Sequence, residues 1–284
     1  MSLLNIIILG IVQGLAELLP VSSSAHVVVA EKLMGLDPSS PPMTLLLAML
    51  HTGTMFAVIA YFWRPWRRTY FHSLPAFKKF AGAVILATVL TGIVGEGLYV
   101  LIEHTLFRGR PHAQIEDLFG RLDLIAPALA AAGVLIVVAG LIERRRGAQS
   151  ADLDTRQAGI IGAIQGLTLP FRGFSRSGAT ISTGMLLGVA KARAEIFSFA
   201  LAVVLTPPLV AREALRLYRA PVDAGADLGA IVARTVFGAL IAFFAGLLAL
   251  KWLSGWLERG RWHLFGIYCL AAAVVVALLH HAGY

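Results

Sequence analysis

A carboxylate, two adjacent serines and an imidazole lie close together near the start of the chain. Glu17 is followed by Ser22, Ser23 and His26, all within ten residues. Gln13 precedes Glu17 by four positions, so a helix stacks the two side chains on one face. His26 follows Ser23 by three residues and Ser22 by four, so the imidazole shares a helix face with a hydroxyl. The group offers a hydroxyl nucleophile with a base nearby, unless Glu17 only pairs with an arginine and His26 only bonds a backbone carbonyl.

A second polar group lies far along the chain, in the segment Arg172-Gly-Phe-Ser-Arg-Ser-Gly-Ala-Thr180. Arg176 carries a planar fork of donors that matches phosphate oxygens. Ser175, Ser177 and Thr180 add hydroxyl donors, and N–H groups at the start of a following helix can cradle an anion. The alternative interpretation is an arginine that extends its head to the membrane surface. Because the segment is otherwise apolar, the sequence favours an anion clamp.

Together the two groups meet the demands of phosphoryl transfer, which needs charge stabilisation and positioning more than covalent machinery. The Glu17 carboxylate and substrate phosphates suit a divalent cation, Mg²⁺ or Ca²⁺. The chain has one cysteine and no Cys/His cluster that would suggest zinc.

The rest of the chain has the composition of an integral membrane protein. Of its 284 residues 58% are hydrophobic and only 14% charged, and the mean hydropathy is +0.78. The net charge of +8 raises the question of nucleic acid. However, the basic residues sit in short clusters between apolar runs, as in proteins that keep Lys and Arg on the cytoplasmic side. No interleaving of aromatic and basic residues supports nucleic-acid binding.

Apolar runs near membrane-spanning length predict an all-α fold with six transmembrane helices. We expect them at residues 43–63, 80–102, 124–142, 196–211, 235–253 and 264–282. Two further apolar regions, 2–34 and 158–190, are interrupted by polar residues, Gly and Pro, and neither half of either region is long enough to cross a bilayer. Each region is therefore predicted to form a re-entrant pair of short helices.

The two interrupted regions share a sequence frame. Gly-x-x-Gln-Gly-Leu occurs at residues 10–15 and again at 162–167, each time followed by a proline and a serine cluster. Such a repeat points to a membrane-embedded binding site within a single domain, with halves at about 1–142 and 158–284. Three spans separate the regions, so they enter from opposite faces as an inverted-topology repeat. The Lys and Arg distribution favours both termini outside.

At these residues the sequence resembles the undecaprenyl-pyrophosphate phosphatase family of bacteria, of the bacitracin-resistance type. The first family motif, a Glu/Gln-x-x-x-Glu helix followed by Pro-x-Ser-Ser-x-x-His, matches residues 13–26. The second, Pro-Gly-x-Ser-Arg-Ser-Gly, is similar to residues 170–178. Shorter similarities at 51–54, 195–199 and 261–269 extend the resemblance over nearly the whole chain.

The resemblance implies six spanning helices plus two re-entrant pairs, and hydrolysis of the C55 isoprenoid diphosphate to its monophosphate and inorganic phosphate. The reaction would take place on the outer side of the bacterial inner membrane, with a divalent cation, and would recycle the lipid carrier for peptidoglycan synthesis. The implied partners are a polyisoprenyl diphosphate and membrane lipids, without nucleic acid, and a homodimer stays open.

The resemblance also implies roles for individual residues. Ser23 would be the nucleophile, His26 its activating base or a proton shuttle, and Glu17 a metal ligand or acid–base group. Arg176 would clamp the diphosphate, and the other substrate contacts would come from Ser175, Ser177, Thr180, Ser22 and Gln13. From the residues alone, the nucleophile stays open among Ser22, Ser23 and His26.

This chain departs from the family pattern at two places. Gln13 stands at the first acidic position, so metal binding would rest on Glu17 and the substrate. Two extra residues, Phe171 and Arg172, precede Gly173, so Arg172 either adds a phosphate contact or marks a subfamily with an altered substrate.

A lipid-phosphate transporter or flippase with the same groove is the alternative function, because interrupted inverted repeats are a transporter architecture. Release of inorganic phosphate by the purified protein would distinguish the enzyme.

Overall fold

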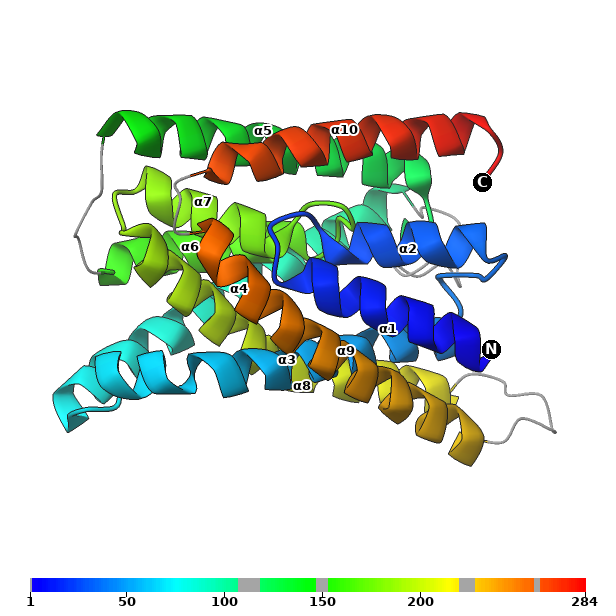
Figure 1. Ribbon diagram of the computed structural model, residues 1–284, viewed down its shortest axis with the longest axis horizontal. Helices are drawn as coiled ribbons and strands as arrows, with labels where there is room; N and C mark the ends of the chain where they lie inside the picture. The colour runs from blue at the N-terminus through cyan, green and yellow to red at the C-terminus, as the bar shows by residue number, and fades with distance from the viewer. Residues whose placement is uncertain (1, 107–117, 147–152, 220–227, 258–260) are drawn as a thin grey trace.

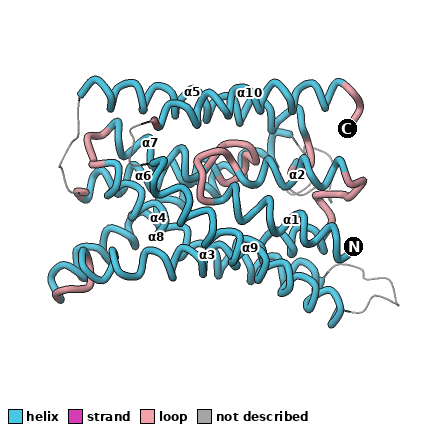
Figure 2. The backbone as a smooth tube through the Cα atoms, in the orientation of Figure 1, coloured by secondary structure: helices cyan, strands magenta, loops and turns pink. Residues whose placement is uncertain are grey.

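The computed structural model describes residues 2–106, 118–146, 153–219, 228–257 and 261–284, and in these ranges the chain forms helices and no strands (Figures 1 and 2). In chain order these helices are α1 (Leu3–Glu17), α2 (Ser23–Leu33), α3 (Pro41–Thr69), α4 (Leu74–Leu106), α5 (Leu122–Arg146), α6 (Thr155–Thr168), α7 (Arg176–Leu186), α8 (Lys191–Arg219), α9 (Leu228–Leu257) and α10 (Trp262–His281).

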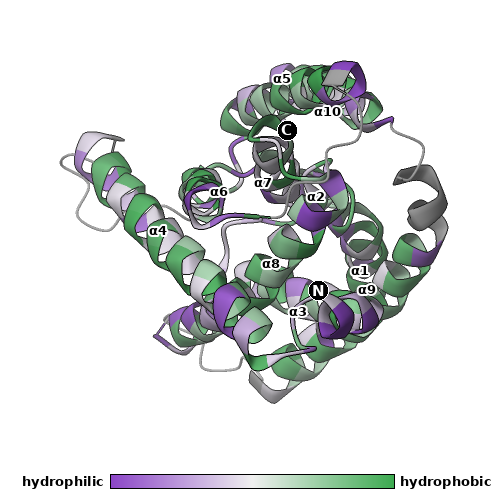
Figure 3. Ribbon diagram, turned by 90° about the vertical axis from the view of Figure 1, so that its left-hand side faces the viewer, coloured by the Kyte–Doolittle hydropathy of each residue, from purple (hydrophilic) through white to green (hydrophobic). Residues whose placement is uncertain are grey.

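Six of these helices, α3, α4, α5, α8, α9 and α10, are long and apolar enough to cross a membrane. Each predicted span falls on one of them, which confirms the all-α class and the six spans. Large apolar side chains cover their outer faces: Ile85 is 63% exposed and Phe244 65%, and Figure 3 shows the long helices as largely hydrophobic. Exposed apolar surface over such lengths is suited to lipid. The chain is a multi-pass membrane protein.

The four remaining helices are short and form two pairs. α1 has 15 residues and α6 has 14, so at 1.5 Å per residue each is about 22 Å long, less than the ~30 Å of a bilayer core. α2 and α7 have 11 residues each. The pair α1–α2 lies toward the end of the molecule where both chain termini are marked, and α6–α7 lies toward the opposite end (Figure 1). Their connecting turns meet near the middle (Figure 2).

The turn between α1 and α2 begins earlier than the proline in the sequence suggests. α1 ends at Glu17, so Pro20 lies within the turn. α2 begins at Ser23, and Ser22 is its N-cap, but the Ser22 hydroxyl makes no capping bond. Ser22 instead has φ 65°, a left-handed conformation that no other non-glycine residue in the described ranges adopts. A serine held there is strained by about 1–3 kcal/mol.

The turn between α6 and α7 is built differently. Its helix N-cap, Ser175, accepts a hydrogen bond from the backbone N–H of Gly178 at 3.1 Å. Gly173 has φ 100°, and a Cβ at this position would lie 2.5 Å from the carbonyl oxygen of Ile125. Only glycine suits this position, because the backbone is left-handed and the neighbouring atom is main chain. The turn is thereby fixed against α5.

Glycines let the first helix of each pair approach a long helix closely. A Cβ on Gly14 of α1 would lie 2.5 Å from the Cβ of Ala245 on α9. A Cβ on Gly162 of α6 would lie 2.3 Å from the carbonyl oxygen of Ala87 on α4. Each short helix is therefore held by the long helix of the opposite half of the chain. This packing positions the two turns against each other.

Candidate active site

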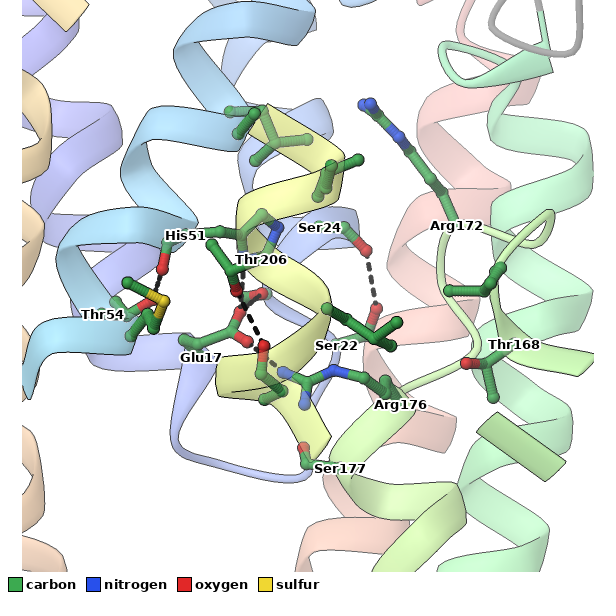
Figure 4. Close-up of a pocket in the computed structure, with 18 of the residues that line it drawn as sticks. Glu17, Ser22, Ser24, His51, Thr54, Thr168, Arg172, Arg176, Ser177 and Thr206 are labelled. Atoms are coloured by element: carbon green, nitrogen blue, oxygen red, sulfur yellow. Dashed lines mark hydrogen bonds and ion pairs between the residues drawn. The ribbon is translucent and has the colours of Figure 1, made fainter. Parts of the chain in front are cut away.

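A cavity of about 210 Å³ lies where the two turns meet helices α3 and α8 (Figure 4). It takes side chains from α1, α2, both turns, α3, α4, α7 and α8, so residues far apart in the sequence share it. The polar residues of the lining that matter most for chemistry are Glu17, Ser23, His51, Arg172, Arg176 and Arg212.

Glu17 is the centre of the hydrogen-bond network at one end of this cavity. Its side chain is 9% exposed, and its Oε1 accepts a hydrogen bond from Arg176 Nη2 at 2.5 Å. Its Oε2 accepts from Ser23 Oγ at 2.5 Å and from Gln13 Nε2 at 2.8 Å. The structure thus brings together Glu17, Ser23 and Arg176, as predicted, with Gln13 one helical turn below.

Ser23 reaches Glu17 because of where α2 begins. As the first residue of α2, it follows the left-handed Ser22, which turns the chain back toward the end of α1. Ser22 also lines the cavity, but its hydroxyl lies 3.4 Å from the Ser24 hydroxyl and not against Glu17. Among the three candidate nucleophiles, only Ser23 donates directly to a carboxylate in the described structure.

Arg176 stands at the first position of α7, where the helix start faces the cavity. It contacts Glu17 through Nη2, whereas its Nη1 has no hydrogen-bond partner among the described residues. Ser175 lines the cavity while its hydroxyl caps α7. Ser177 also lines it and donates to the carbonyl oxygen of Leu19 at 3.4 Å. One guanidinium nitrogen is therefore available to a phosphate oxygen without loss of the Glu17 contact.

Thr180 takes a different position from the other predicted substrate-binding residues. It is fully buried, donates to the carbonyl oxygen of Arg176 at 2.8 Å and lies 2.6 Å from Ser198 Oγ on α8. These contacts join the first turn of α7 to α8. The hydroxyl supports the backbone of Arg176, and its contact with substrate stays a prediction.

His26 lies in a second cavity, of about 420 Å³, between the first helix pair and α10. Its Nδ1 is 2.8 Å from the carbonyl oxygen of Ser22, and its Nε2 is 2.7 Å from the hydroxyl of Tyr268. The rings of His26 and Tyr268 are stacked, with centroids 5.7 Å apart. The structure therefore does not bring the imidazole to the Glu17 network, and its role as the base stays a prediction.

His51, from α3, is the imidazole that the structure places at the Glu17 network. Its Nδ1 lies 3.0 Å from Glu17 Oε2 and 2.8 Å from Gln13 Nε2. The site residues expected from the sequence do not include it. The available signals are a histidine followed by Thr52 and Thr54 inside an apolar span, and the short family similarity at residues 51–54. A polar residue at membrane depth usually faces a cavity or the bundle interior.

The same end of the cavity offers oxygen ligands for a divalent cation. Glu17 supplies the carboxylate. Gln13 does not itself line the cavity, but its fully buried amide oxygen has no hydrogen-bond partner among the described residues. Ser23 adds a hydroxyl. The described residues contain no group of three or more His, Cys, Asp or Glu side chains that could hold a metal alone. The donors fit a hard cation such as Mg²⁺, which commonly uses one or two carboxylates and substrate phosphates.

The other part of the cavity carries two more arginines. The guanidinium carbon of Arg172 lies over the ring of Phe119, 4.0 Å from its centroid, and that of Arg212 lies over the ring of Tyr99, 5.3 Å from its centroid. Glu31 on α2 is buried, and burial raises the pKa of its carboxyl to about 7. The positive charge of Arg172 lowers this pKa, and the negative charge of Asp37 raises it further. Two further guanidinium groups therefore line the cavity besides Arg176, together with the carboxyl of Glu213.

These contacts provide a hydroxyl held on a carboxylate and a guanidinium bound to the same carboxylate. A phosphate that binds Arg176 is therefore brought next to Ser23. This arrangement is suited to in-line transfer of a phosphoryl group, which depends mainly on positioning and on stabilisation of negative charge.

Comparisons with a family model and with known proteins all indicate the same family. A family model described as bacitracin resistance protein BacA matches residues 6–275. The chain is 56% identical to undecaprenyl-diphosphatase 2 of Acinetobacter baylyi, over 98% of each chain. It is 34% identical to an undecaprenyl-diphosphatase of an Anaeromyxobacter species, over 98% of this chain and 88% of the relative. It is 31% identical to an undecaprenyl-diphosphatase of Korarchaeum cryptofilum, over 98% of this chain and all of the relative.

Proposed function

The chain belongs to the bacitracin resistance protein BacA family, and from this membership we propose that it is an undecaprenyl-diphosphatase. It hydrolyses undecaprenyl diphosphate to the monophosphate and inorganic phosphate. The observation that carries the chemistry is that Ser23 and Arg176, the first residues of α2 and α7, both bind the one carboxylate of Glu17.

In the proposed reaction Arg176 binds the terminal phosphate and Ser23 attacks its phosphorus. Ser23 Oγ forms a bond to phosphorus as the bond to the bridging oxygen breaks, and the lipid leaves as its monophosphate. The Ser23 proton passes to Glu17 Oε2, to which the hydroxyl already donates. Water then cleaves the phosphoserine, which releases inorganic phosphate and returns the proton to Ser23. The Ser23–Glu17 distance supports this assignment over Ser22 and His26.

A divalent cation would be held by Glu17, the amide oxygen of Gln13 and phosphate oxygens of the substrate. When bound, it would neutralise negative charge on the diphosphate. Glutamine in place of a second carboxylate leaves the protein with one anionic ligand, so we expect cation binding to depend strongly on the substrate.

We further propose that α1–α2 and α6–α7 are re-entrant pairs in an inverted repeat, with the cavity open toward the outside of the bacterial inner membrane. The short helix lengths and the Lys and Arg distribution support this orientation. In a Cys269→Ala background, Ser2→Cys and Tyr284→Cys should react with an impermeant maleimide in intact cells, and Ser73→Cys should not. Labelling of Ser73→Cys alone would reverse the orientation.

The function is tested by phosphate release from farnesyl diphosphate by purified protein in detergent. We expect release by the unaltered chain, loss with a chelator, and at least about a hundredfold loss in Ser23→Ala. Ser73→Ala, an exposed serine between α3 and α4, is the matched control and should keep normal turnover. Lipid movement across liposomes with no phosphate release would overturn the enzyme and leave the carrier. Normal turnover in Ser23→Ala would remove Ser23 as the nucleophile.

A further inference from the structure

Three atoms from different side chains form a small triangle at the Glu17 end of the cavity. Gln13 Nε2 lies 2.8 Å from Glu17 Oε2 and 2.8 Å from His51 Nδ1, and the His51 and Glu17 atoms are 3.0 Å apart. Glu17 and His51 line the cavity and point toward each other (Figure 4). Gln13 is fully buried and does not line it. The triangle joins α1 to α3 beside Ser23 and Arg176, which bind the same carboxylate.

Hydrogen bonds alone do not satisfy this triangle. Each bond needs one donor and one acceptor, so among three atoms in mutual contact at least one pair is of the same kind. If the Gln13 amide donates to both neighbours, His51 Nδ1 and Glu17 Oε2 are two acceptors at 3.0 Å. If His51 Nδ1 carries a proton for Glu17, it meets a second donor, Gln13 Nε2, at 2.8 Å. A cation bound by all three corners would relieve this conflict, provided that each corner is an acceptor.

The Gln13 amide can supply such an acceptor by a half-turn about its terminal bond. The turn brings Oε1, which has no hydrogen-bond partner among the described residues, to the position that Nε2 now holds. It gives up only the two contacts of Nε2 that a cation would replace. His51 Nδ1 is an acceptor when the imidazole carries its proton on Nε2. Glu17 Oε2 can keep its bond from Ser23, because a carboxylate offers about four lone-pair sites.

The size of the triangle matches octahedral coordination. Ligands that share one face of an octahedron, each about 2.1 Å from the metal, are about 3.0 Å apart, whereas a tetrahedral site spaces them by about 3.4 Å. The observed separations of 2.8, 2.8 and 3.0 Å fit the octahedron. The oxygen donors alone suit Mg²⁺, but imidazole nitrogen shifts the preference toward first-row transition metals. One nitrogen with two oxygens therefore favours Mn²⁺ or Fe²⁺ over Mg²⁺ and Ca²⁺.

We propose that Gln13 Oε1, Glu17 Oε2 and His51 Nδ1 form a facial triad for an octahedral divalent transition-metal ion, Mn²⁺ or Fe²⁺. The opposite face of the ion is open to the cavity, for phosphate oxygens and water. His51 as a third ligand lets an ion that accepts nitrogen bind before the lipid arrives, whereas an ion held by oxygen alone depends on the substrate. The use of the bound ion in catalysis rests on the proposed function, but its binding does not.

The first experiment uses Mn²⁺ as the probe, because its electron paramagnetic resonance counts the free ion and detects nitrogen bound to it. Mn²⁺ is titrated into purified full-length protein in detergent without substrate. We expect a bound ion whose spin echo shows nitrogen modulation, with a frequency that changes when the histidines carry ¹⁵N. His51→Ala should remove this modulation and weaken Mn²⁺ binding at least about tenfold. His72→Ala, which alters an exposed histidine between α3 and α4, is the matched control and should change neither.

Bound Mn²⁺ without nitrogen modulation, or no bound Mn²⁺ in the unaltered protein, would overturn the proposal. Modulation that persists in His51→Ala would assign the nitrogen to another histidine, with the same consequence. Thermal unfolding verifies that each variant is folded. If His51→Ala does not fold, His51→Gln gives the decisive reading, because its amide oxygen can replace the ligand but carries no imidazole nitrogen.

A second experiment tests the preference for a transition metal. Mg²⁺ is added to protein loaded with Mn²⁺, and the released Mn²⁺ is counted. His51→Gln should lower the Mg²⁺ concentration needed for half release at least about fivefold, since the remaining donors are all oxygen. An unchanged concentration would overturn the proposal. Because neither experiment needs turnover, absence of phosphate release from farnesyl diphosphate would defeat the proposed function and leave the triad standing.

Discussion

The two short helix pairs share one sequence frame but contribute different groups to the cavity. In α1–α2 the frame glutamine, Gln13, reaches Glu17 and His51, and the serine that follows the turn donates to the same carboxylate. In α6–α7 the matching glutamine, Gln165, donates to Thr91 on α4 at 3.1 Å, and no carboxylate follows it. The first pair carries Ser23, the proposed nucleophile, with its carboxylate partner, and the second supplies the Arg176 guanidinium.

The difference shows how two helix pairs that share a sequence frame can be specialised by few side chains. Four residues after each frame glutamine stands Glu17 in one pair and Leu169 in the other. One pair presents an anion and the other presents Arg176, so the two turns attract each other at the cavity. A carboxylate and a guanidinium at membrane depth are costly alone and far less so as a pair.

Removal of either member of this pair is expected to have the largest effect. Glu17→Ala and Arg176→Ala should each lower kcat/KM for phosphate release at least about a hundredfold, because charge stabilisation is lost where the transition state forms. The double variant should be little worse than either single variant, since both residues act as one unit. Arg121→Ala is the charge-matched control. Two losses that multiply would show that the residues act independently.

Much of this arrangement is predictable from the sequence, for reasons that the residues make plain. The six spans are predicted from the length of the apolar runs. Glu17 and Arg176 are recognisable as site residues because a charged group in an apolar segment is costly and usually has a function. The contact between them does not follow from local spacing, because it depends on the meeting of two turns. The repeated sequence frame predicts this contact indirectly, because it indicates that both regions contribute to one binding site.

The histidines mark the limit of such prediction. His26 follows Ser23 by one helical turn, which suggests a shared face, but the side of α2 that meets α10 is set by tertiary packing, and Tyr268 holds the ring there. His51 joins Glu17 from a different helix, and no motif spacing connects the two. Thr180 likewise supports α8 through Ser198 rather than lining the cavity. Each outcome depends on a neighbour distant in sequence.

The two frame glutamines offer the next largest contrast. Gln13→Leu should lower kcat/KM about tenfold, because it removes a donor to Glu17 and an oxygen available to a cation. Gln165→Leu should leave kcat/KM within about threefold and instead reduce stability by about 1–3 kcal/mol, since buried Thr91 loses a partner. Activity assays and thermal unfolding of both variants make the comparison. Equal losses of activity would contradict the division of tasks between the pairs.

The glycines at which α1 and α6 contact the long helices should differ in how well they tolerate a side chain. At Gly162 a Cβ would lie 2.3 Å from a backbone carbonyl on α4, which cannot move without the helix. At Gly10 the nearest atoms are Cγ2 and Cβ of Ile241 on α9, at 2.9 and 3.0 Å, so the overlap is smaller than at Gly162. Gly162→Ala should therefore destabilise by about 1–3 kcal/mol and Gly10→Ala by less. Thermal unfolding in detergent compares them with Gly82→Ala, where the space is open. A larger loss at Gly10 would reverse the order.

The smallest expected effects have opposite signs in the two turns. Ser175 caps α7 by accepting from Gly178, so Ser175→Ala should lower the unfolding free energy by about 1 kcal/mol, and Ser175→Asp, which keeps the cap, should restore it. Ser22 makes no capping bond and is held at φ 65°. Ser22→Gly should therefore raise the unfolding free energy by up to about 1 kcal/mol, because glycine adopts this conformation without a Cβ clash. If Ser22→Gly lowers the unfolding free energy as Ser175→Ala does, the Ser22 hydroxyl supports the fold. The left-handed backbone of Ser22 would then not be a strain that is retained because it directs Ser23 toward Glu17.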